Sequence, residues 1–198
     1  MTEQAEPTTE PPAEPLGETP DATPAEAASR TNAAPTGATL PQRDDYYLAL
    51  AFTAATRANC RGRKVGAILV KGDRVIATGY NGTPEGLPNC LDGGCLRCSD
   101  RASFVAGTAY DLCICVHAEA NALLTAGRFG ASTDGTTVYT TDQPCFSCSK
   151  ELIQAGVEKV FYARAWRPDP RVADDYRRLQ ERLHAEHVPT EYEIVEFS

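Results

Sequence analysis

The stretch TTVYTTDQPCFSCSKELIQAGVEKVFYA, residues 136–163, decides the fold. The segments at its two ends, 136–141 and 157–163, are rich in β-branched and aromatic residues, which is typical of strands. Residues 145–155 between them are predicted to form a helix. Strands that alternate with helices in this way are typical of α/β domains.

The alternation continues outward from this stretch. Residues 65–70 form a compact apolar segment, and Lys71-Gly72-Asp73 predicts a turn into a second strand at 74–80. Asp44 and Asp45 can cap a helix that runs to residue 55. Further helices are expected at 118–126 and 171–186, and a last strand near 191–197. We therefore predict an α/β fold with a mixed five-stranded sheet and helices on both faces.

Composition divides the 198-residue chain into a tail and one domain. Residues 1–42 hold eight of the 14 prolines, and seven acidic residues against one basic residue. We predict that this tail is disordered, with a docking role as the alternative, because it has too little apolar surface to offset the entropy of ordering. Residues 43–198 are the expected folded domain.

The distribution of charge and of apolar residues excludes several classes of protein. Most of the net charge of −8 belongs to the tail, so the domain is nearly neutral. This argues against binding of long nucleic acid through a basic face, and leaves a local basic cleft as the alternative. No apolar run approaches the roughly 18–20 residues that span a bilayer. The N-terminus resembles neither a signal nor a transit peptide, so a cytoplasmic protein is expected. In that compartment, the eight cysteines favour metal binding or catalysis over disulfides.

Two short motifs, each at the start of an expected helix, carry the candidate chemistry. His117-Ala118-Glu119 precedes one helix, and Pro144-Cys145-Phe146-Ser147-Cys148 opens the other. Cysteines three residues apart share one face of a helical turn, and a helix N-terminus stabilises thiolates. His117, Cys145 and Cys148 would give zinc three ligands and leave its fourth position for water, as a catalytic zinc requires.

Glu119 is the candidate acid and base. Two thiolates and a neutral imidazole leave Zn²⁺ formally neutral, so a carboxylate beside the water is needed to take and return its proton. The arrangement His-x-Glu…Pro-Cys-x-x-Cys is known as the signature of zinc-dependent nucleobase deaminases. The alternative is a closed structural zinc site with three cysteines and one histidine, in which Glu119 is an ordinary residue of a helix start.

From residue 44 to residue 197 the chain resembles the deoxycytidylate (dCMP) deaminases of the cytidine deaminase superfamily, and its cysteine-rich insert is most similar to the fungal branch. The matching segments, beside the two motifs above, are Cys60, Lys64-Val65-Gly66-Ala67, Gly79-Tyr80-Asn81-Gly82-Thr83-Pro84, Asn89-Cys90, Gly94-Cys95-Leu96-Arg97-Cys98, Cys113-Ile114-Cys115-Val116 and Ala120-Asn121-Ala122. The resemblance implies a cytidine deaminase-like fold and conversion of dCMP to dUMP with release of ammonia, which supplies dUMP for dTMP synthesis.

The resemblance also implies roles for individual residues. Zinc held by the three ligands would activate the attacking water, and Glu119 would carry protons to N3 and to the departing ammonia. Asn81 would bind the deoxyribose, although it also reads as a turn residue in Asn-Gly. Tyr162 would line the substrate pocket, or be an ordinary aromatic of the sheet. Arg128 would contact nucleotide phosphates, often across a subunit contact, or simply favour the end of its helix.

The other six cysteines all precede His117, and most lie in the stretch 81–115, which has no clear periodicity. A structural zinc would cross-link a region that has little apolar content of its own. By resemblance to phage-type relatives, Cys60, Cys90 and Cys115 would bind a second zinc with Cys95, Cys98 or Cys113 as the fourth ligand, and we favour Cys98. A two-zinc cluster of six cysteines is an alternative, as are buried thiols that bind nothing.

The family resemblance further implies a homo-oligomer, often a hexamer, that dCTP activates and dTTP inhibits, with Mg²⁺ carried by the nucleotide. Three alternatives stay open at this point: a free-base or nucleoside deaminase, a tRNA deaminase, and a non-catalytic relative associated with DNA uptake. A tRNA enzyme is expected to have a basic face, and a scaffold would have no use for Glu119.

Overall fold

The computed structural model describes residues 40–104 and 112–194. Nearly all of the predicted tail, and the end of the last predicted strand, lie outside these residues. The helices are α1 (Arg43–Ala55), α2 (Leu96–Ser99), α3 (Ala118–Arg128), α4 (Phe146–Gln154) and α5 (Ala173–Arg182), with short 3-10 turns η1 (Cys90–Asp92), η2 (Arg101–Ser103) and η4 (Pro170–Val172). The strands are β1 (Gly66–Lys71), β2 (Arg74–Tyr80), β3 (Thr137–Asp142), β4 (Lys159–Arg164) and β5 (Glu186–His187).

The five strands form one mixed sheet in the order β2-β1-β3-β4-β5. Strand β1 pairs antiparallel with both β2 and β3, whereas β3, β4 and β5 run parallel. The parallel half contains the stretch 136–163, in which α4 connects β3 to β4. The predicted mixed five-stranded sheet is confirmed.

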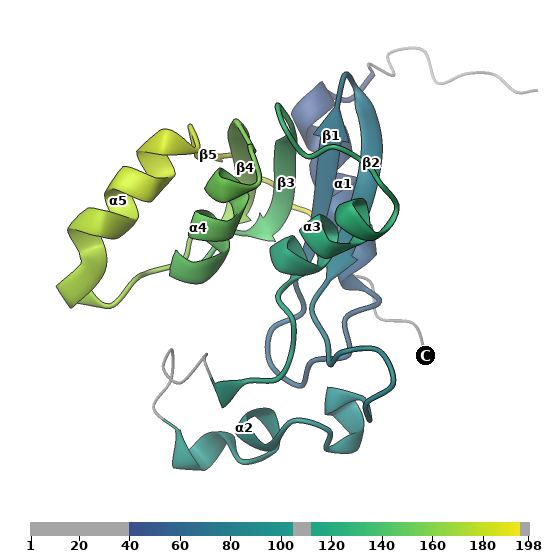
Figure 1. The fold of residues 1–198 in the computed structure, drawn as a ribbon, viewed down its shortest axis with the longest axis vertical. Coiled ribbons are helices and arrows are strands. Elements are labelled where there is room, and N and C mark those ends of the chain that lie inside the picture. Colours follow the sequence, from purple (N-terminus) through teal and green to yellow (C-terminus); the bar gives the residue numbers. More distant parts are fainter. Residues whose placement is uncertain (1–39, 105–111, 195–198) are drawn as a thin grey trace, which may run out of the picture. The chain divides into compact units, whose positions relative to one another are not determined.

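Helices cover both faces of this sheet, as predicted. Successive side chains of a strand point to opposite faces, so Ile68 and Val70 of β1 pack with α1, while Ala67 and Leu69 pack with α3. Leu152 of α4 and the buried Leu183, which follows α5, join the α3 side. Figure 1 shows α3 and α4 in front of the sheet and α1 behind it.

Three boundaries differ from the sequence predictions. Helix α5 ends at Arg182 and not at residue 186, because the chain turns there to join the sheet. The fifth strand of the sheet is Glu186–His187, earlier in the chain than predicted, because the chain pairs with the free edge of β4 soon after α5. Of the predicted range 191–197, residues 191–194 are irregular and the others lie outside the described residues. Helix α1 begins one residue before Asp44, so the expected aspartate cap does not form. Asp44 instead accepts a hydrogen bond from the Tyr139 hydroxyl at 2.8 Å.

Close approach of helix to strand requires glycine at two positions. A Cβ atom on Gly66 would overlap the carbonyl oxygen of Ala51 in α1, and one on Gly79 would overlap that of Ala118 in α3. Gly79 therefore determines how closely the first turn of α3 approaches β2. This contact fixes the position of the His117–Glu119 motif.

We expect Gly79→Ala to lower the free energy of unfolding by about 1–3 kcal/mol, because the added methyl group must displace the α3 backbone. Gly127→Ala is the matched control: Gly127 lies in α3 itself, and nothing is within 4 Å of a Cβ atom added there. That variant should be as stable as the parent chain or up to about 1 kcal/mol more stable. Urea unfolding of the two variants measures the difference, and equal midpoints would contradict the packing argument.

Candidate active site and cysteine cluster

The N-termini of two helices meet at the site. His117 is the residue before α3, and Cys145 is the residue before α4. An antiparallel bridge between Gly82 and Val116 ties the segment before His117 to the loop after β2. Helices α3 and α4 pack against each other, so the two motifs of the sequence come together in space.

His117, Cys145 and Cys148 form a compact set of metal ligands. Their ligand atoms all lie within 4.8 Å of one another. The His117 Nδ1 atom is 3.4 Å from the Sγ atoms of both Cys145 and Cys148. Two sulfurs and one imidazole nitrogen at these separations fit a single zinc ion, whose bonds to sulfur and nitrogen are about 2.3 and 2.0–2.1 Å long.

The electrostatics of these side chains also favour a cation. The hydrogen bond with the Cys148 thiol, reinforced by one with His117, lowers the pKa of Cys145 to about 4. The hydrogen bond to Cys145 in turn raises the pKa of His117. A thiolate is therefore already present, and a metal would displace the protons that its neighbours still hold.

Glu119 lies in the first turn of α3 and is only 4% exposed. Burial raises the pKa of its carboxyl group to about 7, and the negative charge of Cys145 adds to the increase. A carboxyl group with a pKa near neutral pH can both accept and return a proton. No ligand atom of Glu119 belongs to the set formed by His117, Cys145 and Cys148, as expected for a proton carrier beside a metal.

The two motifs open into a cavity of about 370 Å³. Its lining includes His117, Glu119 and Cys145, and also Asn81. The Asn81 amide donates to the Arg63 carbonyl at 2.9 Å and accepts from the Val65 N–H at 2.8 Å. Asn81 thus shapes the loop that borders the cavity, and the residue lines the same space as Glu119.

Several cavity residues were not predicted from the sequence. They are Arg63, Arg97, Arg101, Phe104, Asp142, Gln143 and Trp166. Asp142 is buried between Arg63 at 2.7 Å and Arg164 at 2.9 Å. Arg97 and Arg101 come from the segment without periodicity, so no pattern could have placed them beside His117.

Two predicted substrate residues lie outside the lining of this cavity. Arg128 pairs with Glu85 at 2.9 Å on an exposed surface. Tyr162 is on β4, where its ring lies 5.5 Å from that of His187. Their proposed contacts with the nucleotide stay predictions.

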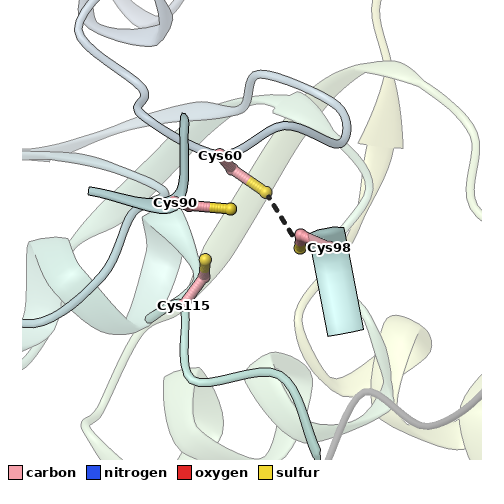
Figure 2. A group of neighbouring side chains, drawn as sticks. All are labelled: Cys60, Cys90, Cys98 and Cys115. Carbon is pink, nitrogen blue, oxygen red and sulfur yellow. Dashed lines mark hydrogen bonds between the residues drawn. The ribbon is translucent and has the colours of Figure 1, made fainter. Parts of the chain in front are cut away.

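The other six cysteines gather into one cluster, named here the six-cysteine cluster: Cys60, Cys90, Cys95, Cys98, Cys113 and Cys115. Within it, the sulfurs of Cys60, Cys90, Cys98 and Cys115 lie within 4.8 Å of one another. Figure 2 shows these four side chains pointing toward a common centre. They are the four residues favoured from the sequence as a second zinc site.

A mixed sheet with a His-Cys-Cys site and a buried glutamate at two helix N-termini defines the class of zinc-dependent nucleobase deaminases. Residues 41–164 match the family described as the cytidine and deoxycytidylate deaminase zinc-binding region. The chain belongs to this family.

Named relatives agree with this membership. The chain is 45% identical over 133 residues to the deoxycytidylate deaminase of Schizosaccharomyces pombe, covering 67% of this chain and 40% of that protein. It is 41% identical over 130 residues to the deoxycytidylate deaminase of Mycobacterium phage D29, covering 63% of this chain and 96% of that protein. The chain thus spans less than half the length of the fungal relative.

A crystal structure supports the fold assignment. The dCMP deaminase of cyanophage S-TIM5 in complex with dCMP and dUMP superposes with a TM-score of 0.58 at 32% identity, over 76% of this chain and 100% of that one. In the part of this chain that the structure describes, no helix is long and apolar enough to cross a membrane.

We expect Cys145→Ser to lower the zinc content by one ion per chain, because the low-pKa thiolate of the three-ligand set is lost. Ser147→Ala is the matched control, since Ser147 is exposed two residues further on and its hydroxyl bonds only to Glu151 at 3.2 Å among the contacts of the described chain. Elemental analysis of the purified variants measures the change. Equal zinc in the two variants would remove Cys145 from the ligand set.

Proposed function

We propose that this protein catalyses the hydrolytic deamination of dCMP to dUMP, with release of ammonia, within residues 43–198. The observation that carries the proposal is that the buried Glu119 lines one cavity with His117 and Cys145, two members of the ligand set that Cys148 completes. The substrate is supported by the similarity to the cyanophage enzyme, which was crystallised with dCMP and dUMP.

The three-ligand set accounts for the water that replaces the amino group. We propose His117, Cys145 and Cys148 as the zinc ligands, and zinc bound there would act as a Lewis acid that lowers the pKa of a water molecule. The Cys145 thiolate at the N-terminus of α4, where the helix dipole stabilises negative charge, is an anionic ligand for that cation.

Glu119 moves the protons of the reaction. Its carboxylate accepts one proton from the attacking water and delivers it to N3 of the cytosine ring, and it then transfers the second proton to the amino group as ammonia leaves C4. The sum is water plus dCMP giving dUMP plus ammonia, and Glu119 returns to its starting state. A pKa of about 7 suits a group that must act in both directions.

We expect Glu119→Gln to lower kcat for dCMP by about 10²–10⁴-fold, because the amide keeps the shape of the side chain but carries no proton between water and substrate. The zinc content should stay that of the parent chain. Glu158→Gln serves as the control, since Glu158 is an exposed carboxylate between α4 and β4, outside the lining of the cavity, and its loss should leave kcat unchanged. An ammonia-release assay measures both, and full activity of the Glu119 variant would refute its role.

Arginines of the cavity are our candidates for the 5′-phosphate. Arg97 and Arg101 line the same space as Glu119 and would supply the positive charge that a nucleotide monophosphate requires. Arg128 is proposed, from the family resemblance, for a phosphate bound across a contact between subunits. Asn81, which borders the cavity, is proposed for the deoxyribose, and Tyr162 remains a proposed pocket residue.

We expect Arg101→Ala to raise KM for dCMP by about tenfold or more, since a hydrogen bond to a charged group contributes about 1.5–3 kcal/mol. KM for deoxycytidine, which has no phosphate, should not change. Arg128→Ala provides the comparison in a steady-state assay. A rise in KM for dCMP only in the Arg128 variant would transfer the phosphate role to that residue.

We further propose that Cys60, Cys90, Cys98 and Cys115 hold a second, structural zinc, and that the protein forms a homo-oligomer, a hexamer by the resemblance. Exposed apolar side chains on and after α3, Leu124 and Phe129, are consistent with a contact between copies. Regulation by dCTP and dTTP, with Mg²⁺ bound to the nucleotide, is proposed from the resemblance alone.

A further inference from the structure

Cysteine side chains alone form the buried interior of the six-cysteine cluster. Cys60, Cys90, Cys95, Cys98 and Cys115 are buried together, and Cys113 packs against them as a partly buried sixth member. The leucines of the same segment point outward: Leu87, Leu91 and Leu96 are 51%, 49% and 76% exposed. If apolar burial ordered this segment, the leucines would fill its interior in preference to thiols. Something other than hydrophobic packing must therefore hold it together.

The cluster contains two sets of four sulfurs, and the sets overlap. One set is Cys60, Cys90, Cys98 and Cys115, and the other is Cys95, Cys98, Cys113 and Cys115. In each set, all sulfur atoms lie within 4.8 Å of one another. Two residues, Cys98 and Cys115, belong to both sets. Two tetrahedra that share two corners need six ligands, which is the number present in the cluster.

The spacing of the sulfurs matches zinc coordination. Four sulfurs at about 2.3 Å from a tetrahedral zinc are separated from one another by about 3.8 Å. In the structure, the sulfur–sulfur separations are 3.8 Å for Cys60–Cys98, 3.7 Å for Cys95–Cys113 and 3.8 Å for Cys98–Cys113. Cys98 is thus at the tetrahedral distance from one member of each set. A disulfide, with its bond of about 2.05 Å, fits none of these pairs.

Backbone N–H groups donate to three of the four sulfurs that belong to a single set. Cys60 accepts a hydrogen bond from the Gly62 N–H, and Cys90 accepts one from the Arg61 N–H, both at 3.3 Å. Cys95 accepts from the backbone of Cys98 and Ile114. A thiolate bound to one metal retains more negative charge than a bridging thiolate, so it is the better acceptor for N–H groups. For Cys60, Cys90 and Cys95 the donors thus lie where outer ligands would need them.

We propose that the six-cysteine cluster binds two zinc ions, with Cys98 and Cys115 bridging them. Cys60 and Cys90 complete the first ion, and Cys95 and Cys113 complete the second. This proposal extends the single structural zinc proposed above, and it does not depend on the substrate. Four residues of the cluster, Cys60, Cys98, Cys113 and Cys115, line the cavity together with Arg97 and Arg101. The bound zinc ions would then stabilise this part of the cavity wall.

The test counts zinc on the full chain and looks for a metal–metal distance. We expect three zinc ions per parent chain, and two in Cys145→Ser, whose remaining metals belong to the cluster. Zinc X-ray absorption of this variant should show sulfur-only coordination and a zinc–zinc scattering shell. If the variant does not fold, the parent chain alone tests the proposal through its count of three zinc ions, and its spectrum should still contain the zinc–zinc shell.

The alternatives give different numbers. Two zinc ions per parent chain, without a zinc–zinc shell, would contradict a second zinc ion in the cluster. Three ions without that shell would contradict the bridged pair. The double variant Cys95→Ser/Cys113→Ser should lose one ion if both residues are ligands, and it should lose none if the cluster binds only one zinc through the other four. Loss of dCMP turnover in a chain that still holds three zinc ions would refute the proposed activity and leave the cluster standing.

Discussion

The contact between Gly79 of β2 and the first turn of α3 is the constraint on which the rest of the site depends. Because glycine allows Ala118 to approach the strand, α3 begins at a fixed height above the sheet. His117 and Glu119 flank Ala118, so their positions follow from this contact. Small residues continue along the same face, where Ala118, Ala122 and Ala126 are buried. The helix is thereby held close enough to the sheet to bring its N-terminus beside that of α4.

Sulfur performs two different tasks around one cavity. At the start of α4, hydrogen bonding makes Cys145 a thiolate and leaves a buried carboxyl group nearby with a pKa close to neutrality. Four residues of the six-cysteine cluster line the same cavity, and they belong to a segment whose cysteines are buried while its leucines are exposed. The first arrangement suits a metal that takes part in chemistry, and the second suits metals that replace a hydrophobic core.

The sequence allowed the sheet, its helices and the two motifs to be predicted, because each rests on local patterns. The hydrophobic periodicity of residues 136–163 predicts the alternation of strands and helices. The spacing of Cys145 and Cys148 as ligands follows from the geometry of one helical turn. The predicted last strand, near 191–197, lies later in the chain than β5, because only pairing with β4 defines β5. Two residues are too few to give a periodic signal.

For a related reason, the sequence could not predict the arginines of the cavity or the two cysteines that belong to both sets of four sulfurs. Arg97, Arg101 and the six-cysteine cluster lie in loops whose path depends on contacts between segments far apart in the chain, such as Cys60 with Cys98. Residue types and spacing identify such cysteines as ligands but leave their grouping open. Only the distances between sulfur atoms divide them into two sets that overlap.

The most direct test of the central claim compares ammonia release by the zinc-loaded parent chain from dCMP, deoxycytidine and cytosine under the same conditions. The account predicts strong turnover of dCMP and little of the two substrates that lack a phosphate. Preferred turnover of deoxycytidine or cytosine would keep the zinc chemistry but contradict the proposed nucleotide substrate. Absence of turnover with all three, in a chain that holds its zinc, would contradict the proposed activity and leave a tRNA substrate or a non-catalytic role as the alternatives.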